Sequence, residues 1–205
     1  MNHNRLWLAD WRRAVAGLYH ALRAEGDRAR GAEVFRRGRD ALFARHPSSP
    51  LEPAQKEKFK GLPHFPYDAR WRTTGAFTPL PGGPAREVAV GEDGALRLSA
   101  IGTVDFSVNG HDGQLTLYWL EGYGGGLWLP FTDATSGGAT YGGGRCLRDA
   151  IKGVDLGTEG GRLVLDFNHA YNPSCAHSVR WVCPLAPREN RLGFAVDAGE
   201  MAPGR

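Results

Sequence analysis

The chain has 205 residues, of which 41% are hydrophobic and 23% are charged, with a net charge of +3. This composition supplies enough apolar surface for one folded core, and it excludes a large multidomain assembly and a wholly disordered chain. No run of residues approaches the roughly 20 apolar residues that span a bilayer, and the first residues lack the apolar run of a secretion signal. We therefore predict a soluble, cytoplasmic protein with no membrane association.

Charge and glycine are distributed unevenly, and the change falls near Lys60. Residues 1–60 carry 13 Lys and Arg against 7 Asp and Glu, whereas residues 61–205 carry 12 against 15. Only four of the 29 glycines lie before residue 61. We predict a helical segment at 1–60 and a turn-rich β domain at 61–205. Nucleic-acid binding is not favoured, because the early arginines alternate with apolar residues at helical spacing instead of forming a solvated tail.

Two amphipathic helices and a short third one are predicted in the first segment. The first has apolar residues at steps of three and four and breaks at Gly26. Its apolar positions are Trp7, Trp11, Ala14, Leu18 and Leu22. The second runs through 34–43 and stops at Pro47, and Pro53 begins a helix that ends near Lys60. We interpret the two tryptophans as core residues, with stacking on a ligand as the alternative.

From Trp71 onward apolar and polar residues alternate, which is the period of a β-strand. The alternating runs begin at Trp71, Leu96, Val104, Leu115, Leu127, Leu163 and Leu192. Turn residues at 91–94 and 109–113 separate neighbouring runs and favour antiparallel hairpins. Seven or more strands without long intervening helices predict an α+β protein: an antiparallel β barrel or strongly curved sheet with the N-terminal helical segment packed on it. A two-sheet sandwich is the alternative.

Short sequence blocks occur in a characteristic order over about residues 60–200. They are FTDATSG at 131–137, TYGGGR at 140–145, DFN at 166–168, AYNP at 170–173, CA at 175–176, CPLAP at 183–187, ENRL at 189–192 and AGE at 198–200. In this order they resemble the bacterial domain-of-unknown-function family 1684, and SPL at 49–51 and FPYD at 65–68 resemble its upstream region. The resemblance implies a shared fold and a shared polar constellation, and the family name assigns no activity. His169 and His177 depart from the family's pattern.

Polar residues within these blocks are the candidate site. Asp166 and Asn168 are two apart on one predicted strand and therefore share a face. If that face is buried, they need polar partners, because unpaired burial costs several kcal/mol. The suitable partners are Tyr141, Arg145, Asn172, Glu189, Asn190 and Arg191. We interpret the whole group as a ligand pocket, and a structural network that fastens loops is the alternative. Asp133 is interpreted as a turn residue.

Metal, cofactor and thiol chemistry receive little support. Cys146, Cys175 and Cys183 are expected to be reduced, with a Cys175–Cys183 bridge as the alternative. His169, Cys175, His177 and Cys183 have ligand types that suit zinc but lack the close cysteine pairs of a zinc knuckle, so we predict no metal site. Phosphate-binding loops, a serine-hydrolase elbow and a zinc-protease helix are absent from the sequence, and no cofactor is indicated.

Two functions remain open from the sequence. The first is a β-barrel domain that binds a small molecule, anionic in our preferred version. Asp166 or Glu189 would then act as acid or base, and Arg145 or Arg191 would hold the anionic group. The second is an interaction module whose basic amphipathic helices, residues 5–45, contact a partner or a second copy. Whether the protein is an enzyme stays open.

Overall fold

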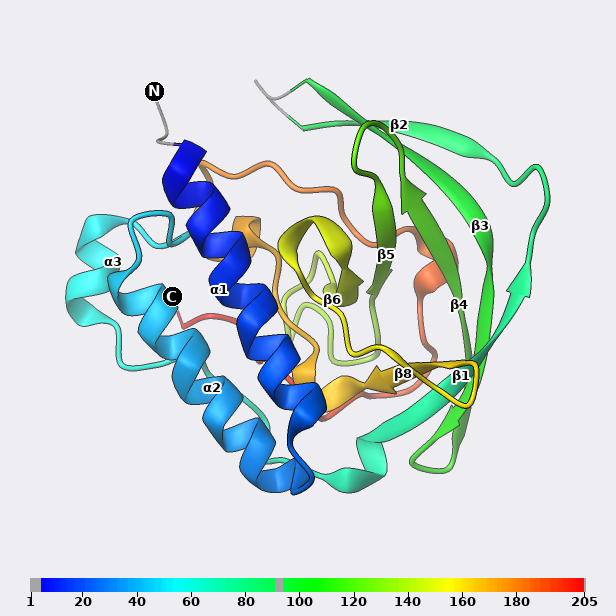
Figure 1. Cartoon of the computed structure of the whole chain (residues 1–205), viewed down its shortest axis with the longest axis horizontal. Helices are drawn as coiled ribbons and strands as arrows, with labels where there is room; N and C mark the ends of the chain where they lie inside the picture. Colours follow the sequence, from blue (N-terminus) through cyan, green and yellow to red (C-terminus); the bar gives the residue numbers. More distant parts are fainter. Residues whose placement is uncertain (1–4, 91–93, 205) are drawn as a thin grey trace.

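The computed structural model describes residues 5–90 and 94–204, which form a helical layer packed on a curved antiparallel sheet (Figure 1). The helices are α1 (Arg5–Ala24), α2 (Arg28–Arg45) and α3 (Pro53–Lys58). The strands are β1 (Arg72–Pro79), β2 (Ala85–Ala89), β3 (Ala95–Val108), β4 (His111–Leu120), β5 (Gly126–Phe131), β6 (Arg145–Asp149), β7 (Thr158–Glu159) and β8 (Arg162–Asp166). Short 3-10 helices follow β8 in the chain and include η4 (Phe167–His169), η5 (Ser174–Ala176) and η6 (Arg188–Asn190).

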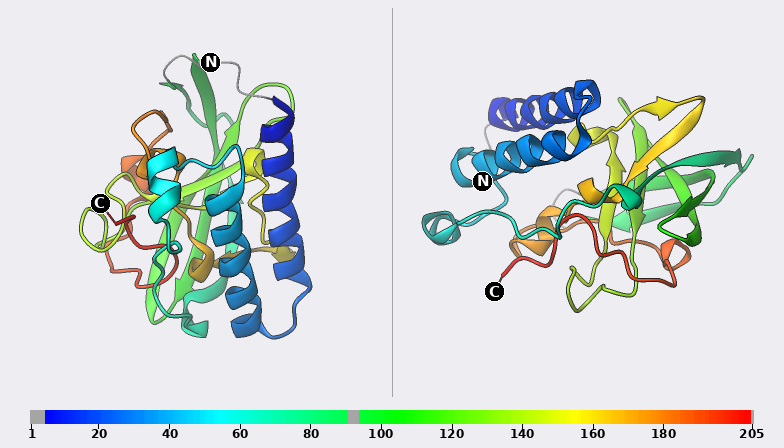
Figure 2. Two further views of the ribbon diagram at one scale, coloured as in Figure 1. Left: turned by 90° about the vertical axis from the view of Figure 1, so that its left-hand side faces the viewer. Right: turned by 90° about the horizontal axis from the view of Figure 1, so that it is seen from below.

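All strand pairs are antiparallel, and they form one continuous sheet in the order β6-β5-β4-β3-β1-β8-β7, with β2 added beside β3. The path curves into a half-barrel, and α1 and α2 lie side by side on one side of it (Figure 2). The predicted curved sheet with a helical segment packed on it is therefore confirmed, and the sandwich alternative is wrong. No helix within residues 5–90 and 94–204 is long and apolar enough to cross a membrane.

Local signals set the helix boundaries close to the predicted ones. The Asp27 carboxylate accepts a hydrogen bond from the Arg30 backbone N–H and caps the start of α2. This satisfies one of the backbone donors that the first turn of a helix leaves unpaired. Helix α2 ends at Arg45, and its C-cap His46 is extended and directly precedes Pro47. Pro53 occupies the first position of α3, where its missing N–H costs nothing.

The buried face of α1 differs from the predicted stripe. Val15, Tyr19 and Leu22 are its buried residues, and they pack against the sheet. Trp11 packs against Phe43 of α2 with the two rings tilted by 56° and their centroids 5.7 Å apart. Trp7 is 51% exposed, so the core interpretation holds for Trp11 and is wrong for Trp7. The spacing of three and four residues predicts a stripe, but the tilt of the neighbouring elements decides which edge of that stripe is covered.

A β-bulge in β3 lets one strand supply two separate cores. Its pairing with β4 shifts by one residue between Ala100 and Gly102. Before the bulge, Leu98 and Ala100 pack against the helical layer; after it, Val104 and Phe106 pack on the opposite face. Since side chains alternate with a period of two, one extra residue switches the face that the even-numbered positions occupy. The runs predicted at 96–100 and 104–108 are thus one continuous strand.

The bulge depends on a glycine, which gives a testable prediction. A Cβ atom added at Gly102 would lie 2.3 Å from the Thr78 carbonyl oxygen of the paired strand β1. We expect Gly102→Ala to reduce the free energy of unfolding by about 1–3 kcal/mol, because backbone atoms of a paired strand cannot move aside cheaply. Urea denaturation measures this loss. Gly17→Ala in α1, where no atom lies within 4 Å of the added Cβ, is the control and should be neutral or stabilising.

The remaining strand and turn predictions are partly confirmed. The run at 192–196 is not a strand; it is irregular chain whose Leu192 and Val196 pack into the core on the sheet face away from the helices. The turn between β3 and β4 is confirmed at Asn109 and Gly110, which both have positive φ. Residues 91–93 of the other predicted turn lie outside the described residues. Strand β8 ends at Asp166, so Asn168 lies in η4 and not on the same strand.

Candidate functional site

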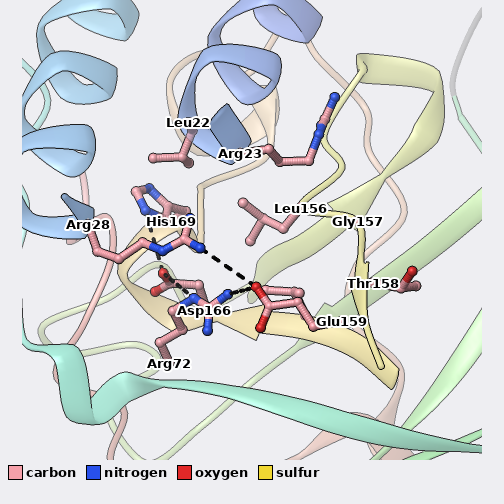
Figure 3. A pocket seen from close by; sticks show the side chains of 11 residues that line it. Leu22, Arg23, Arg28, Arg72, Leu156, Gly157, Thr158, Glu159, Asp166 and His169 are labelled. Carbon is pink, nitrogen blue, oxygen red and sulfur yellow. Dashed lines mark hydrogen bonds and ion pairs between the residues drawn. The ribbon is translucent and has the colours of Figure 1, made fainter. Parts of the chain in front are cut away.

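A cavity of about 140 Å³ lies where the helical layer meets the edge of the sheet (Figure 3). The end of α1, the start of α2, the start of β1, the β7–β8 hairpin and η4 surround it. Its lining residues are Leu22, Arg23, Arg28, Arg72, Leu156, Gly157, Thr158, Glu159, Val164, Asp166 and His169. A cavity of about 150 Å³ holds a molecule the size of benzene, so this one suits a small molecule of about six non-hydrogen atoms.

The polar floor of the cavity contains Asp166, the first acid–base candidate of the sequence. Its Oδ1 atom accepts hydrogen bonds from the backbone N–H and side-chain amide of Asn168, at 3.1 and 2.9 Å. Its Oδ2 atom lies 3.9 Å from the Arg72 Nε atom. Burial raises the pKa of Asp166, while the Asn168 hydrogen bonds act in the opposite direction. The carboxyl group is therefore held in one orientation, with one oxygen directed toward the cavity's cations.

Asn168 connects this floor to a neighbouring loop. Its side-chain amide donates to the Asp68 carbonyl at 2.8 Å and its side-chain oxygen accepts from the Asp68 backbone N–H at 2.9 Å. Asn168 itself is only 1% exposed. Asn168 does not line the cavity itself; it holds the Asp166 carboxylate in place through its hydrogen bonds.

His169 is the second buried polar group of the cavity. Burial, followed in importance by the nearby Arg36 charge, lowers the pKa of His169 to about 3, so the ring is neutral at neutral pH. Its Nε2 atom lies 3.7 Å from Asp166 Oδ2, a separation longer than a hydrogen bond. Among the described residues, its Nδ1 atom has no hydrogen-bond partner. A buried ring nitrogen without a hydrogen-bond partner is uncommon in folded proteins, and it indicates that a ligand or an ordered water binds beside His169.

Two arginines from different elements converge at the opening of the cavity. Arg72 donates to Glu159 Oε1, and Arg28 lies 3.7 Å from the same oxygen (Figure 3). Both guanidinium groups thus lie within ion-pair distance of one carboxylate oxygen. With Arg23, the lining carries three positive charges against the two of Glu159 and Asp166, a net of +1 when His169 is neutral.

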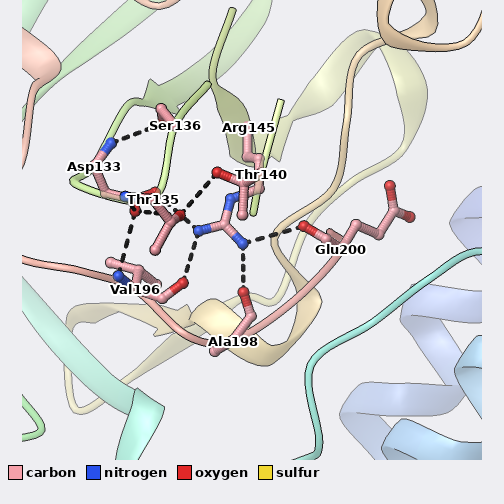
Figure 4. Close-up of polar contacts among 8 residues, drawn as sticks. All are labelled: Asp133, Thr135, Ser136, Thr140, Arg145, Val196, Ala198 and Glu200. Carbon is pink, nitrogen blue, oxygen red and sulfur yellow. Dashed lines mark hydrogen bonds and ion pairs between the residues drawn. The ribbon is translucent and has the colours of Figure 1, made fainter. Parts of the chain in front are cut away.

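Arg145, another predicted site residue, belongs to a different and closed network (Figure 4). Its guanidinium group pairs with Asp133 at 2.9 Å and donates to the carbonyls of Val196, Ala198 and Glu200. Asp133 also accepts from the Thr135 hydroxyl and backbone N–H, as a turn residue does. Arg145 is 1% exposed. This network anchors the C-terminal segment to β6, which corresponds to the structural alternative for Arg145 and to the turn interpretation of Asp133.

The other five predicted residues each contact a different set of partners. Asn172 binds Met201 and the Glu200 carboxylate, and Asn190 binds the backbone of Thr116 and Pro130. Glu189 accepts from Tyr118 and Arg86, Tyr141 donates to Cys175, and Arg191 is exposed and bridges Thr132 through its backbone. The eight residues therefore do not surround one pocket. Asp166 lines the cavity, Asn168 supports it, and the remaining six lie elsewhere.

The sequence did not single out the cavity's cations. Arg23 and Arg28 flank the break between two helices, where they resemble ordinary surface charges. Arg72 reaches Asp166 because β1 and β8 pair directly at these two residues. Strand register is a long-range property, so the positions of Arg72 and Asp166 in the sequence do not predict that they pair. In the sequence His169 stands out as a departure from the family's pattern and as one of four residues whose types suit zinc, although no metal site is predicted there. No group of three or more potential metal ligands lies together within residues 5–90 and 94–204.

Comparisons with known proteins identify the family. The family model described as "Protein of unknown function (DUF1684)" matches residues 57–201. The chain belongs to the DUF1684 family. A solution NMR structure of an uncharacterized protein from Haloarcula marismortui is similar to this DUF1684 protein, with 30% identity and a TM-score of 0.58. The similarity covers 82% of this chain and 91% of that one. No curated protein matches the chain.

The family match confirms the resemblance that the order of the sequence blocks indicates. The DUF1684 region contains Arg72, Glu159, Asp166 and His169, and it excludes Arg23 and Arg28 of the helical layer. The floor of the cavity is thus built from the region that defines the family, whereas part of its opening comes from the preceding segment.

Proposed function

We propose that this protein binds a small monoanionic molecule, such as a short-chain carboxylate, in the cavity between the helical layer and the β7–β8 hairpin. The observation that carries the proposal is the convergence of Arg28 and Arg72 on one carboxylate oxygen at the cavity opening. Glu159 provides that oxygen here, and an anionic ligand would use the same donors. Arginine suits this task because its planar guanidinium group presents several donors to a carboxylate.

The rest of the lining favours a compact ligand with an apolar part. Leu22, Leu156 and Val164 supply an apolar wall, and Asp166 and His169 supply two polar groups at the floor. This combination of an apolar wall and a few fixed polar groups is typical of small-molecule sites. The volume of about 140 Å³ excludes a nucleotide. Asp166, whose pKa is raised by burial, is the acid–base candidate in this proposal, and no reaction is assigned to it.

Three basic residues of the helices face the β domain, which favours the pocket over the interaction module, whereas six others are exposed, namely Arg5, Arg12, Arg13, Arg30, Arg37 and Arg45. Arg28 pairs with Glu159, Arg23 donates to the Asp155 carbonyl, and Arg39 pairs with the buried Glu200. These side chains are engaged within the chain, so they do not form a free basic face for a partner. Binding through the helices and self-association stay predictions from the sequence.

A binding experiment with matched variants tests the proposal. Acetate, lactate, benzoate and inorganic phosphate would be titrated while NMR chemical shifts and the thermal midpoint are recorded. We expect a carboxylate to bind, Arg72→Gln to weaken it at least about tenfold, and Glu159→Gln to strengthen it, because that substitution removes the internal competitor. Arg86→Gln, which disrupts the Glu189 pair outside the cavity, is the control and should bind as the unmodified protein does.

The opposing responses of the two variants make the result decisive. Non-specific attraction to a positively charged surface would weaken equally in Arg72→Gln and Arg86→Gln, and it would fade with added salt. The proposal fails if none of the four probes perturbs the unmodified protein or the Glu159→Gln variant.

A further inference from the structure

The floor of the cavity presents a carboxylate oxygen, Asp166 Oδ2, to which no group of the described residues donates a hydrogen bond. Asn168 donates both of its hydrogen bonds to the other oxygen, Oδ1. The Oδ2 atom lies 3.9 Å from Arg72 Nε and 3.7 Å from His169 Nε2, and both separations exceed a hydrogen bond. Figure 3 shows the His169 ring and the Arg72 guanidinium group directed at this carboxylate. Because buried carboxylate oxygens normally accept hydrogen bonds, Oδ2 is an acceptor available to a ligand.

His169 supplies a donor beside that acceptor. The side chains of His169 and Asp166 are 2% and 5% exposed, so neither can turn into bulk water. Burial, followed by the Arg36 charge, lowers the pKa of His169, so the neutral ring carries one proton. The proton is assigned to Nε2, because this atom lies beside a carboxylate, whereas Nδ1 has no acceptor within residues 5–90 and 94–204. The floor thus offers an N–H donor and a carboxylate acceptor 3.7 Å apart.

A hydroxyl group matches this pair better than other small groups do. Its oxygen accepts one hydrogen bond while its proton is donated to another atom. An oxygen about 2.8 Å from each of two atoms 3.7 Å apart makes two hydrogen bonds of ordinary length. A methyl group would leave both atoms unpaired. A carbonyl oxygen accepts from His169 but donates nothing to Asp166, and an ammonium group donates but cannot accept.

The position of Arg72 relates this hydroxyl position to the carboxylate position at the cavity opening. Its guanidinium group donates to Glu159 and also lies 3.9 Å from Asp166 Oδ2. A ligand carboxylate that replaces Glu159 on Arg72 therefore lies next to the floor, and a substituent on the adjacent carbon is the one that reaches Oδ2. The volume of about 140 Å³ suits about six non-hydrogen atoms, the size of a three-carbon hydroxy acid.

We propose that the ligand of the cavity is a short 2-hydroxy acid, whose hydroxyl group accepts a hydrogen bond from His169 and donates one to Asp166. Its carboxylate binds Arg28 and Arg72, so this inference rests on the proposed function. It goes further because it names the substituent that the floor selects. The apolar wall of the cavity contacts the remaining carbon of the ligand.

A matched series of ligands tests the inference. D-lactate, L-lactate, pyruvate, propionate and L-alanine are three-carbon acids that carry a hydroxyl, a carbonyl, only hydrogen or an ammonium group on the second carbon. Each would be titrated into the unmodified full chain at neutral pH, and NMR chemical shifts would give the dissociation constants. We expect the tighter lactate enantiomer to bind at least about tenfold more tightly than pyruvate, propionate and alanine, because a hydrogen bond to a charged group is lost without the hydroxyl.

Two variants assign the preference to the floor. Asp166→Asn keeps an acceptor for Asn168 but replaces Oδ2 by an amide donor. The preference for lactate over propionate should then fall below about twofold, while propionate still binds. His169→Leu removes the donor and should also reduce the preference, which keeps the test valid if Asp166→Asn does not fold. Asp112→Asn, at an exposed carboxylate that accepts from Ser107 outside the cavity, is the matched control and should keep the full preference.

The outcomes separate this inference from the proposed function. Equal affinities for lactate, pyruvate and propionate would overturn the selection of a hydroxyl and leave the carboxylate site intact. Tighter binding of alanine than of lactate would also contradict it, since the floor would then select a cation. A full lactate preference in folded Asp166→Asn would show that the hydroxyl does not bind Asp166. If no acid in the series binds the unmodified protein or the Glu159→Gln variant, the proposed function fails and this inference fails with it.

Discussion

Replacing Glu200 by Ala should reduce the free energy of unfolding by about 3–5 kcal/mol, a large part of the roughly 5–15 kcal/mol that a domain has in total. Glu200 is 1% exposed and Arg39 is 3% exposed. The Glu200 Oε1 atom accepts two hydrogen bonds from Arg39, and Oε2 accepts one from the Asn172 backbone. Without Glu200, Arg39 keeps a buried charge with no counter-ion, and an N–H group loses its acceptor.

The measurement is urea denaturation of Glu200→Ala beside two comparison variants. Glu33→Ala removes one partner of an exposed pair with Arg37, where both side chains are 67% exposed, and should change stability by less than about 0.5 kcal/mol. Arg39→Met combined with Glu200→Leu should recover much of the loss, because no buried charge remains unpaired. Equal effects of Glu200→Ala and Glu33→Ala would contradict this account.

Acid should destabilise the protein well above the pH at which carboxylates titrate. Burial lowers the pKa of His169 to about 3 and that of His177 to about 4, from the ordinary value of 6.5. The unfolded chain therefore binds these protons first as pH falls, and stability declines below pH 6.5. Each pKa unit corresponds to about 1.4 kcal/mol, and the unfolded histidines are already half protonated at pH 6.5. Lowering the pH from 6.5 to 5 therefore costs about 1.6 kcal/mol per histidine, or about 3 kcal/mol together.

Neighbouring groups define the useful pH window. Burial also lowers the pKa of His64, which adds in the same direction. The pKa of Glu200 lies below 4.5, so its contribution is lost only below that pH. Asp166 acts in the opposite sense, because its raised pKa lets the folded state bind a proton before the unfolded state does. The histidines thus dominate between pH 6.5 and 4.5.

Urea midpoints at pH 7, 6 and 5 measure this dependence. His169→Gln and His177→Gln should each flatten the decline by removing one titrating group, and the double variant should flatten it further. His20→Gln, at an exposed position of α1, is the control and should follow the unmodified protein. A midpoint that stays constant from pH 7 to pH 5 in the unmodified protein would show that the two rings are not held neutral by burial.

The candidate site can be predicted only in part from the sequence, because the partners of its polar residues lie far away in the chain. Asp166 and Asn168 were recognised because a carboxylate and an amide two residues apart beside a buried strand need partners. Their actual partners, Arg72 and Asp68, are nearly 100 residues away in the chain. Arg145 is predicted as a partner for the same reason, and it pairs instead with Asp133 and peptide carbonyls, while its Nε atom has no hydrogen-bond partner among the described residues.

The fold class, the helices and most of the strands can be predicted from local properties of the chain: the period of apolar residues, caps such as Asp27, and turn residues such as Asn109 and Gly110. Which polar groups meet depends instead on how the strands pair and curve. A single bulge at 100–102 changes the face that β3 presents, and the β1–β8 register brings Arg72 to Asp166. Register and curvature arise from long-range packing, so no short spacing in the chain encodes them.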